Sequence, residues 1–83
     1  MYATANPSPV PPGSYYTVTA GGGVAPYSFA LGGSPPNPPD VVLTIVGGEA
    51  RVFVPAGAPL GSVVTVIATD SAANQASSNN PVK

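Results

Sequence analysis

The stretch Val41-Val42-Leu43-Thr44-Ile45-Val46-Gly47-Gly48-Glu49-Ala50-Arg51-Val52-Phe53-Val54 decides the fold. Its two runs, 41–46 and 49–54, are rich in the β-branched and aromatic residues that favour strands. Two glycines separate the runs, which is the spacing of a tight hairpin whose central residues both adopt positive φ. The stretch therefore predicts two antiparallel strands joined at Gly47 and Gly48.

Other strands are expected on both sides of this hairpin. Residues 15–20 alternate, with Tyr16 and Val18 on one face and Tyr15 on the other. Residues 27–31 and 62–70 alternate too, and the more polar segment 75–82 is expected to form a last strand. Between 32 and 40 the four prolines predict an irregular or polyproline II connection.

Six or seven short strands separated by turn-forming residues, with no helical periodicity, predict an all-β fold. We expect a β-sandwich of about seven antiparallel strands in two sheets. The alternation assigns these residues to its core: Val18, Tyr27, Phe29, Leu31, Leu43, Ile45, Val52, Val54, Val64, Val66 and Ala68.

Four prolines lie near the N-terminus, at positions 7, 9, 11 and 12. Because proline cannot donate a hydrogen bond to a sheet, we expect residues 1–14 to form a proline-rich lead-in or an edge strand. Residues 15–83 are then the sandwich itself. Met1 is the only methionine, and no signal-like region follows it, which indicates a domain taken from a longer protein.

Composition excludes several classes of function. The 83 residues include 12 Pro and 10 Gly but only five charged side chains, and 43% are hydrophobic, which opposes a disordered chain. No His or Cys is present, so a Ser-His-Asp triad, a thiol nucleophile, a disulfide and the usual zinc ligands are excluded. Two basic residues are too few for nucleic-acid binding, and no apolar stretch is long enough for membrane insertion.

Two segments resemble the immunoglobulin-like and cadherin-like repeats of bacterial extracellular proteins. Residues 19–29, TAGGGVAPYSF, look like the GG-x-x-P-Y-x-Φ signature of those repeats, where Φ is an apolar residue. Residues 64–74, VTVIATDSAAN, are similar to their closing V-x-V-x-A-x-D-S-x-G-N segment, with Ala73 in place of the usual glycine. The acidic clusters that bind calcium between cadherin repeats are missing.

This resemblance implies an immunoglobulin-like β-sandwich that serves as a non-catalytic structural or spacer module of a bacterial surface or secreted protein, such as an adhesin. Such modules occur in tandem, so the implied partners are neighbouring repeats of the same polypeptide. The implied location is extracellular, and no cofactor is expected.

Tyr15 and Tyr2 are the candidates for a ligand site, because exposed aromatic rings on a β surface stack on sugar rings. Tyr16 and Tyr27 fall instead on core-facing stripes. An alternative function is therefore a carbohydrate-binding or other ligand-binding module, with a polysaccharide as partner.

The acidic residues suggest weaker alternatives. Asp70 and Asn74 are a weak candidate for half of a calcium site, although calcium needs six to eight oxygen ligands, and an Asx-type turn at Asp70 explains both residues. Two of Asp40, Glu49 and Asp70 would have to meet in a cleft to act as the acid and base of a glycosidase. A small sandwich leaves little room for one, so we expect no enzyme activity.

Sparse charge also leaves the predicted sheet edges without Lys or Glu to protect them. Prolines take that role near the N-terminus and at Pro81. A second alternative function is therefore a self-assembling fibre subunit, in which another copy of the chain adds a strand to an edge.

Overall fold

The computed structural model describes residues 1–32 and 40–83, which form seven strands and no helix. The proline-rich connection predicted over residues 32–40 lies almost entirely outside the described residues. The predicted all-β class with seven strands is confirmed. The strands are β1 Tyr2–Asn6, β2 Tyr15–Gly21, β3 Ser28–Leu31, β4 Val42–Val46, β5 Glu49–Phe53, β6 Val63–Thr69 and β7 Gln75–Pro81.

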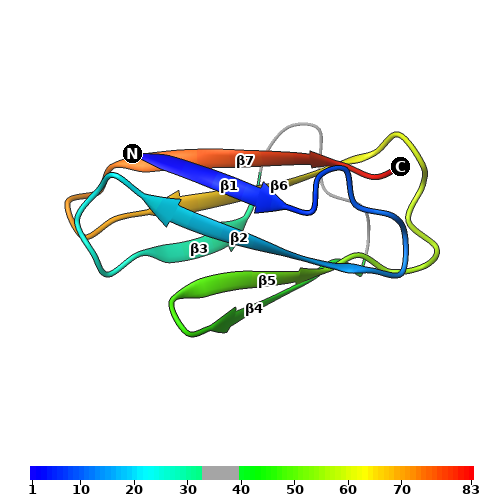
Figure 1. Ribbon diagram of the computed structural model, residues 1–83, viewed down its shortest axis with the longest axis horizontal. Coiled ribbons are helices and arrows are strands. Elements are labelled where there is room, and N and C mark those ends of the chain that lie inside the picture. Colours follow the sequence, from blue (N-terminus) through cyan, green and yellow to red (C-terminus); the bar gives the residue numbers. More distant parts are fainter. Residues whose placement is uncertain (33–39) are drawn as a thin grey trace.

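The strands pair antiparallel in two sheets, of order β1-β2-β5-β4 and β3-β6-β7 (Figure 1). This order is that of the seven-stranded, constant-type immunoglobulin sandwich. The β4–β5 hairpin has the predicted register, with Val46 opposite Glu49, and Gly47 and Gly48 have φ values of 58° and 80°. The two antiparallel sheets are those of the predicted β-sandwich.

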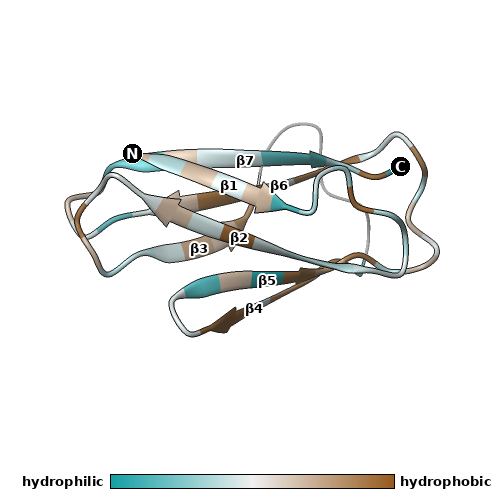
Figure 2. Ribbon diagram, viewed as in Figure 1, coloured by the Kyte–Doolittle hydropathy of each residue, from teal (hydrophilic) through white to brown (hydrophobic). Residues whose placement is uncertain are grey.

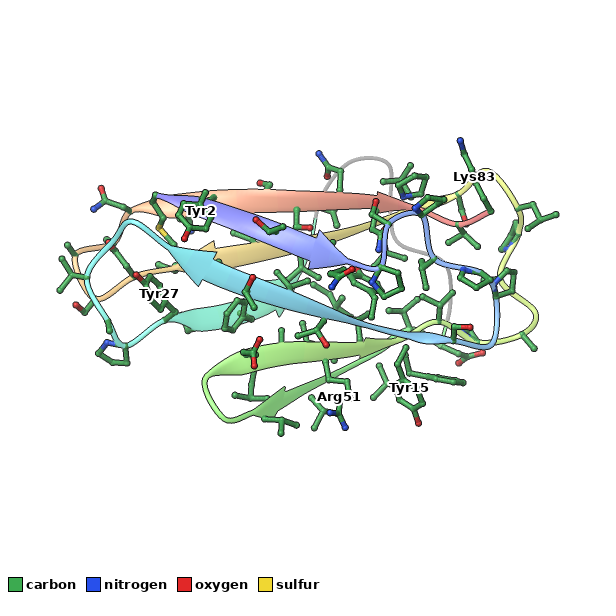
Figure 3. All side chains as sticks on the ribbon, viewed as in Figure 1. Tyr2, Tyr15, Tyr27, Arg51 and Lys83 are labelled. Carbon is green, nitrogen blue, oxygen red and sulfur yellow. The ribbon has the colours of Figure 1, made fainter. Side chains whose placement is uncertain are left out.

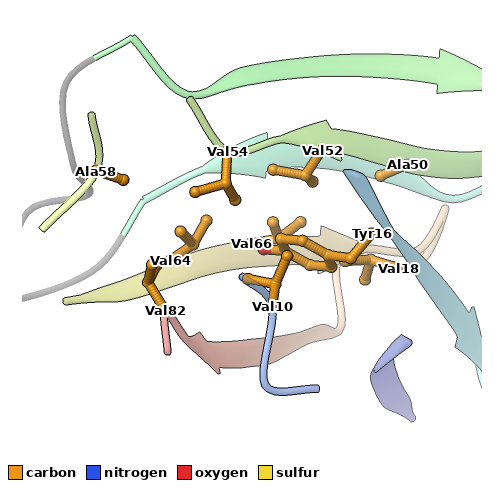
Figure 4. Close-up of a cluster of buried hydrophobic side chains, with 10 residues drawn as sticks. All are labelled: Val10, Tyr16, Val18, Ala50, Val52, Val54, Ala58, Val64, Val66 and Val82. Atoms are coloured by element: carbon orange, nitrogen blue, oxygen red, sulfur yellow. The ribbon is translucent and has the colours of Figure 1, made fainter. Parts of the chain in front are cut away.

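A core of buried aliphatic side chains around Tyr16 fills the space between the sheets (Figure 4). Six predicted core residues are completely buried: Val18, Val52, Val54, Val64, Val66 and Ala68. Phe29 and Leu43 pack against the cluster while partly exposed, and Tyr27 is half-buried at the entrance to β3. Val10, Ala50, Ala58 and Val82 also belong to the core, although the alternation did not identify them.

The prediction that Ile45 and Leu31 belong to the core is wrong. Ile45 is 53% exposed and Leu31 is 37% exposed. Ile45 lies on the inward-facing side of β4, as its pairing with the buried Ala50 shows. However, β4 and β3 are edge strands with few contacts between them, so this side of the sandwich is open as far as the described residues go. Figure 2 shows β4 as an apolar strand at the margin of the molecule.

The opposite side of the sandwich is closed by the two ends of the chain. β1 is an edge strand paired with β2, and beyond the first prolines Val10 forms a parallel bridge with Val82. The N–H of Val10 donates to the carbonyl of Pro81 at 3.0 Å, and the N–H of Lys83 donates to the carbonyl of Val10 at 3.0 Å. The proline-rich segment therefore contributes a buried valine that joins the two sheets.

The sandwich is elongated, with extents of 36 × 25 × 18 Å. Its two termini lie near opposite ends of the long axis, and β1 and β7 both run lengthwise along it (Figure 1). The described residues include no helix of the length and hydropathy needed to span a membrane.

Candidate functional site

The outward face of the four-stranded sheet carries the most prominent exposed aromatic group. Tyr15 is 61% exposed, and its ring lies 4.9 Å from the ring of Phe53, centroid to centroid, at an interplanar angle of 52°. Tyr15 and Val42 are both paired with Phe53, on either side of it. The three side chains therefore form an apolar row across β2, β5 and β4.

Polar side chains follow this row along the same face. The next residues in register are Thr17, Arg51 and Thr44. Thr17, Val46, Glu49 and Arg51 line a small depression of about 60 Å³. A broader and shallower depression continues toward β1, lined by Thr4, Ala5, Asn6, Thr17, Thr19 and Glu49.

Together these groups have the chemistry needed to hold a sugar. An exposed tyrosine ring offers an apolar surface for a pyranose ring, and threonine hydroxyls, the Glu49 carboxylate and the Arg51 guanidinium can exchange hydrogen bonds with its hydroxyls. The depressions are shallow and open, whereas small-molecule sites bury most of their ligand. Any ligand held here would be bound weakly.

Tyr2 lies on the same face as Tyr15 but far from it. It is 59% exposed and stands opposite Gly21, whose missing side chain leaves the space that the Tyr2 ring occupies. Any side chain at position 21 would collide with that ring. Gly21 lies six positions along β2 from Tyr15, about 20 Å of strand, and Figure 3 shows the two labelled tyrosines well apart. They do not form one platform.

Asp70 is buried and lies at the end of β6, where it connects two loops. Its Oδ1 accepts hydrogen bonds from the backbone N–H groups of Ala72 at 3.0 Å and Asn74 at 2.8 Å. Its Oδ2 accepts from the N–H of Val24 at 2.9 Å and from the Asn74 side-chain amide at 3.1 Å. The turn expected at Asp70 is present, and it also fixes the β2–β3 connection to the β6–β7 turn.

These bonds determine the acidity of Asp70. The hydrogen bond from Val24, helped by those from Asn74 and Ala72, lowers the pKa of the carboxyl below its ordinary value and outweighs the opposing effect of burial. Four donors bind its two oxygens, so Asp70 holds the β2–β3 connection and the β6–β7 turn together. It is not arranged to offer free oxygens to a cation.

The other acidic residues lie elsewhere. Glu49 begins β5, while Asp40 precedes β4 at the far end of the same hairpin. Within residues 1–32 and 40–83, no three His, Cys, Asp or Glu side chains gather into a group that could hold a metal ion.

Comparisons with models of known protein families, with curated proteins and with solved structures give no match to this chain. The fold class therefore rests on the strand order, and the candidate site rests on its geometry.

Sequence reasoning correctly placed Tyr15 on the outward face but missed its contact with Phe53. Alternation within residues 49–54 was a usable signal, since it puts Glu49, Arg51 and Phe53 on the face opposite Ala50 and Val52. Which residue of β2 faces Phe53 depends on register between strands about 38 residues apart in sequence, and no local pattern specifies that register.

Proposed function

We propose that this chain is a non-catalytic structural or spacer module of a bacterial surface or secreted protein, joined end to end with neighbouring repeats. The position of the two termini is the observation that carries the proposal. They lie near opposite ends of a sandwich 36 Å long, so modules joined through them extend a chain without folding back on it.

The terminal strands support a mechanical role. β1 begins at one end of the long axis and β7 ends at the other, and both run lengthwise (Figure 1). A force on the two termini therefore pulls each strand along its own axis. In that geometry the hydrogen bonds that hold a strand are loaded together, whereas peeling breaks them one at a time.

Two links support the ends of the module. The Val10–Val82 bridge joins the two terminal segments near the C-terminal end. Asp70 joins the β2–β3 and β6–β7 loops at the other end, where Ser71 adds a 2.9 Å hydrogen bond from its N–H to the carbonyl of Val24. Loops fixed in this way present a defined surface to the next module.

Small-angle X-ray scattering from chains of one, two and three tandem copies tests the spacer proposal. Each added copy should lengthen the maximum dimension by close to the 36 Å long axis. As a control, copies joined by a long Gly/Ser linker should give a broader distribution of distances between copies, because such linkers behave as random coils. A maximum dimension that barely grows with copy number would contradict the proposal.

The Tyr15–Phe53 pair supports a second candidate function, weak binding of a polysaccharide. On that hypothesis Tyr15→Ala abolishes retardation of the protein in a polysaccharide gel and leaves the thermal melt nearly unchanged. Tyr2→Ala is a matched control, since Tyr2 has a similar exposure but lies away from Phe53 and from the small depression that Arg51 and Glu49 line. Equal retardation of Tyr15→Ala and the unmodified protein on every gel would remove this candidate.

A further inference from the structure

We propose that β4 pairs antiparallel with β4 of a second copy of this chain, about a two-fold axis beside Thr44, to form a closed dimer. The proposal concerns the side of the sandwich away from the termini. It goes beyond the spacer function, because it adds a lateral contact between chains.

Among residues 1–32 and 40–83, nothing protects the edge of β4. Val42, Ile45 and Val46 are 53%, 53% and 45% exposed, and the strand contains no charged residue and no proline. Exposed apolar edges of this kind are templates for pairing with another strand, and proteins usually protect them with charge, proline or a cover. In contrast, the side formed by β1 and β7 has a proline-rich segment and the Val10–Val82 bridge.

The backbone of β4 offers bonding groups at the right positions. In a hairpin closed by a two-residue turn, the residues flanking the turn, here Val46 and Glu49, are hydrogen-bonded to each other. Bonded and non-bonded pairs alternate along an antiparallel ladder, so the groups of Thr44 and Val42 also point toward β5. The N–H and C=O groups of Leu43 and Ile45 therefore point away from the sheet.

Strand β4 is complementary to itself in one register. With Thr44 opposite Thr44 of the second copy, Leu43 faces Ile45 of that copy, and Val42 faces Val46 of that copy. Every pair then matches in size and polarity, as cross-strand neighbours should. The two Leu43–Ile45 pairs use the outward backbone groups and would form four hydrogen bonds between the copies. This complementarity identifies a second copy as the occupant.

Charge at the centre of the contact does not oppose it. The formal net charge is −1, and the nearest charges to the centre are the Arg51 side chains, one strand behind Thr44 in each copy. Three strand spacings, about 14 Å, would separate the two Arg51 positions, which is beyond the Debye length of about 8 Å at physiological ionic strength. At each end, the same register places Asp40 of one copy opposite Gly48 and beside Glu49 of the other copy, and these two carboxylates repel each other in a way that salt screens.

The size of the contact sets its strength. Five residues of edge extend about 17 Å, so the contact falls well below the roughly 1,200 Å² of total buried area at which stable complexes begin. We therefore expect a dissociation constant on the order of 0.1–1 mM. An isologous contact uses the same edge on both copies, so assembly stops at two instead of forming a fibre.

Sedimentation equilibrium from about 10 μM to about 1 mM tests the dimer. The unmodified chain should change from monomer to dimer over this range, and Ile45→Lys should remain monomeric throughout. Val24→Lys is the matched control: Val24 is 55% exposed in the β2–β3 connection, so this variant adds the same charge away from β4 and should still dimerise. A monomeric unmodified chain at the highest concentration, or dimerisation of Ile45→Lys, would overturn the proposal.

Disulfide trapping tests the register, and it does not depend on Ile45→Lys remaining folded. The chain has no cysteine, so Thr44→Cys introduces one that faces its own copy. Directly opposite residues of a non-bonded pair have Cα atoms about 4.5 Å apart, which a disulfide can span. Thr44→Cys should cross-link under mild oxidation at least tenfold faster than Ile45→Cys or Thr19→Cys. Equal rates in the three variants would contradict the register.

Discussion

The Asp70 carboxylate accepts a 2.9 Å hydrogen bond from the backbone N–H of Val24, which lies 46 residues earlier in the chain. The same carboxylate also holds the β6–β7 turn through Ala72 and Asn74. A single acidic side chain thus positions two loops, and its ionisation is linked to folding.

Acid should destabilise the protein through Asp70. Because its folded-state pKa is lowered, the stabilisation is present above the unfolded pKa of about 4 and is lost as pH falls through the folded pKa. Thermal melts between pH 2 and pH 7 should show this loss, and Asp70→Asn should reduce it. Glu49→Gln, which neutralises an exposed carboxylate outside this network, should retain the loss. The same acid dependence in Asp70→Asn and the unmodified protein would rule out this linkage.

Tyr16 should make stability sensitive to alkali. Burial raises the pKa of its phenol above the ordinary value of about 10, so the unfolded chain releases this proton first. Its contribution to stability is complete below about pH 10 and decreases above it. Denaturant unfolding between pH 8 and pH 11 should show the decrease, and Tyr16→Phe should show less of it. An identical alkaline profile for the two proteins would contradict this prediction.

The same Tyr16 hydroxyl is buried without a hydrogen-bond partner among the described residues. Leaving a buried polar group unpaired is costly, so Tyr16→Phe should raise the free energy of unfolding at neutral pH by about 1 kcal/mol. Urea denaturation measures this change. Destabilisation by Tyr16→Phe would show that the hydroxyl has a partner in solution.

Val66 tests the core. It is completely buried, so Val66→Ala should lower the free energy of unfolding by roughly 2–3 kcal/mol through lost packing and a residual cavity. Val24→Ala removes the same atoms from a side chain that is 55% exposed. It should change the free energy of unfolding by less than about 0.5 kcal/mol. Val66→Asp should unfold the domain. A cooperative melt in Val66→Asp would refute the core assignment.

The β4–β5 turn requires glycine for backbone reasons alone. Gly48 has a φ of 80°, and nothing lies within 4 Å of the position its Cβ would take. Gly48→Ala should therefore cost about 1–2 kcal/mol of stability through strain. Gly57 has equally open surroundings and no positive φ, so Gly57→Ala should be neutral or slightly stabilising. Equal effects of the two substitutions in urea denaturation would contradict this explanation.

Most of the fold could be predicted from local pattern. The strands of the hairpin, the Gly47-Gly48 turn and the buried faces of β2, β5 and β6 all follow from alternation, because a side-chain period of two is a property of each strand alone. Alternation shows which face a residue belongs to but not whether that face is covered. Ile45 was misplaced for this reason, since its face is directed inward at an open margin.

The missed residues depended on long-range contacts. Val10 and Val82 meet across 72 residues of sequence. Val10 lies between two prolines and Val82 follows Pro81, so neither valine belongs to an alternating run. Tyr15 was correctly placed on the surface, but its contact with Phe53 depends on register between distant strands. The Val24 bond to Asp70 was missed too, because an Asx-type turn accounts only for the neighbours of Asp70.

On the proposed function, the module should resist force along the line between its termini, and single-molecule pulling measures this resistance. Pulling on the two termini loads β1 and β7 lengthwise. Pulling between the N-terminus and a cysteine at Ala72→Cys, in the exposed β6–β7 turn near the same end, peels the strands instead (Figure 1). The rupture force should be clearly higher in the first geometry. Equal forces, or a lower force between the termini, would contradict this expectation.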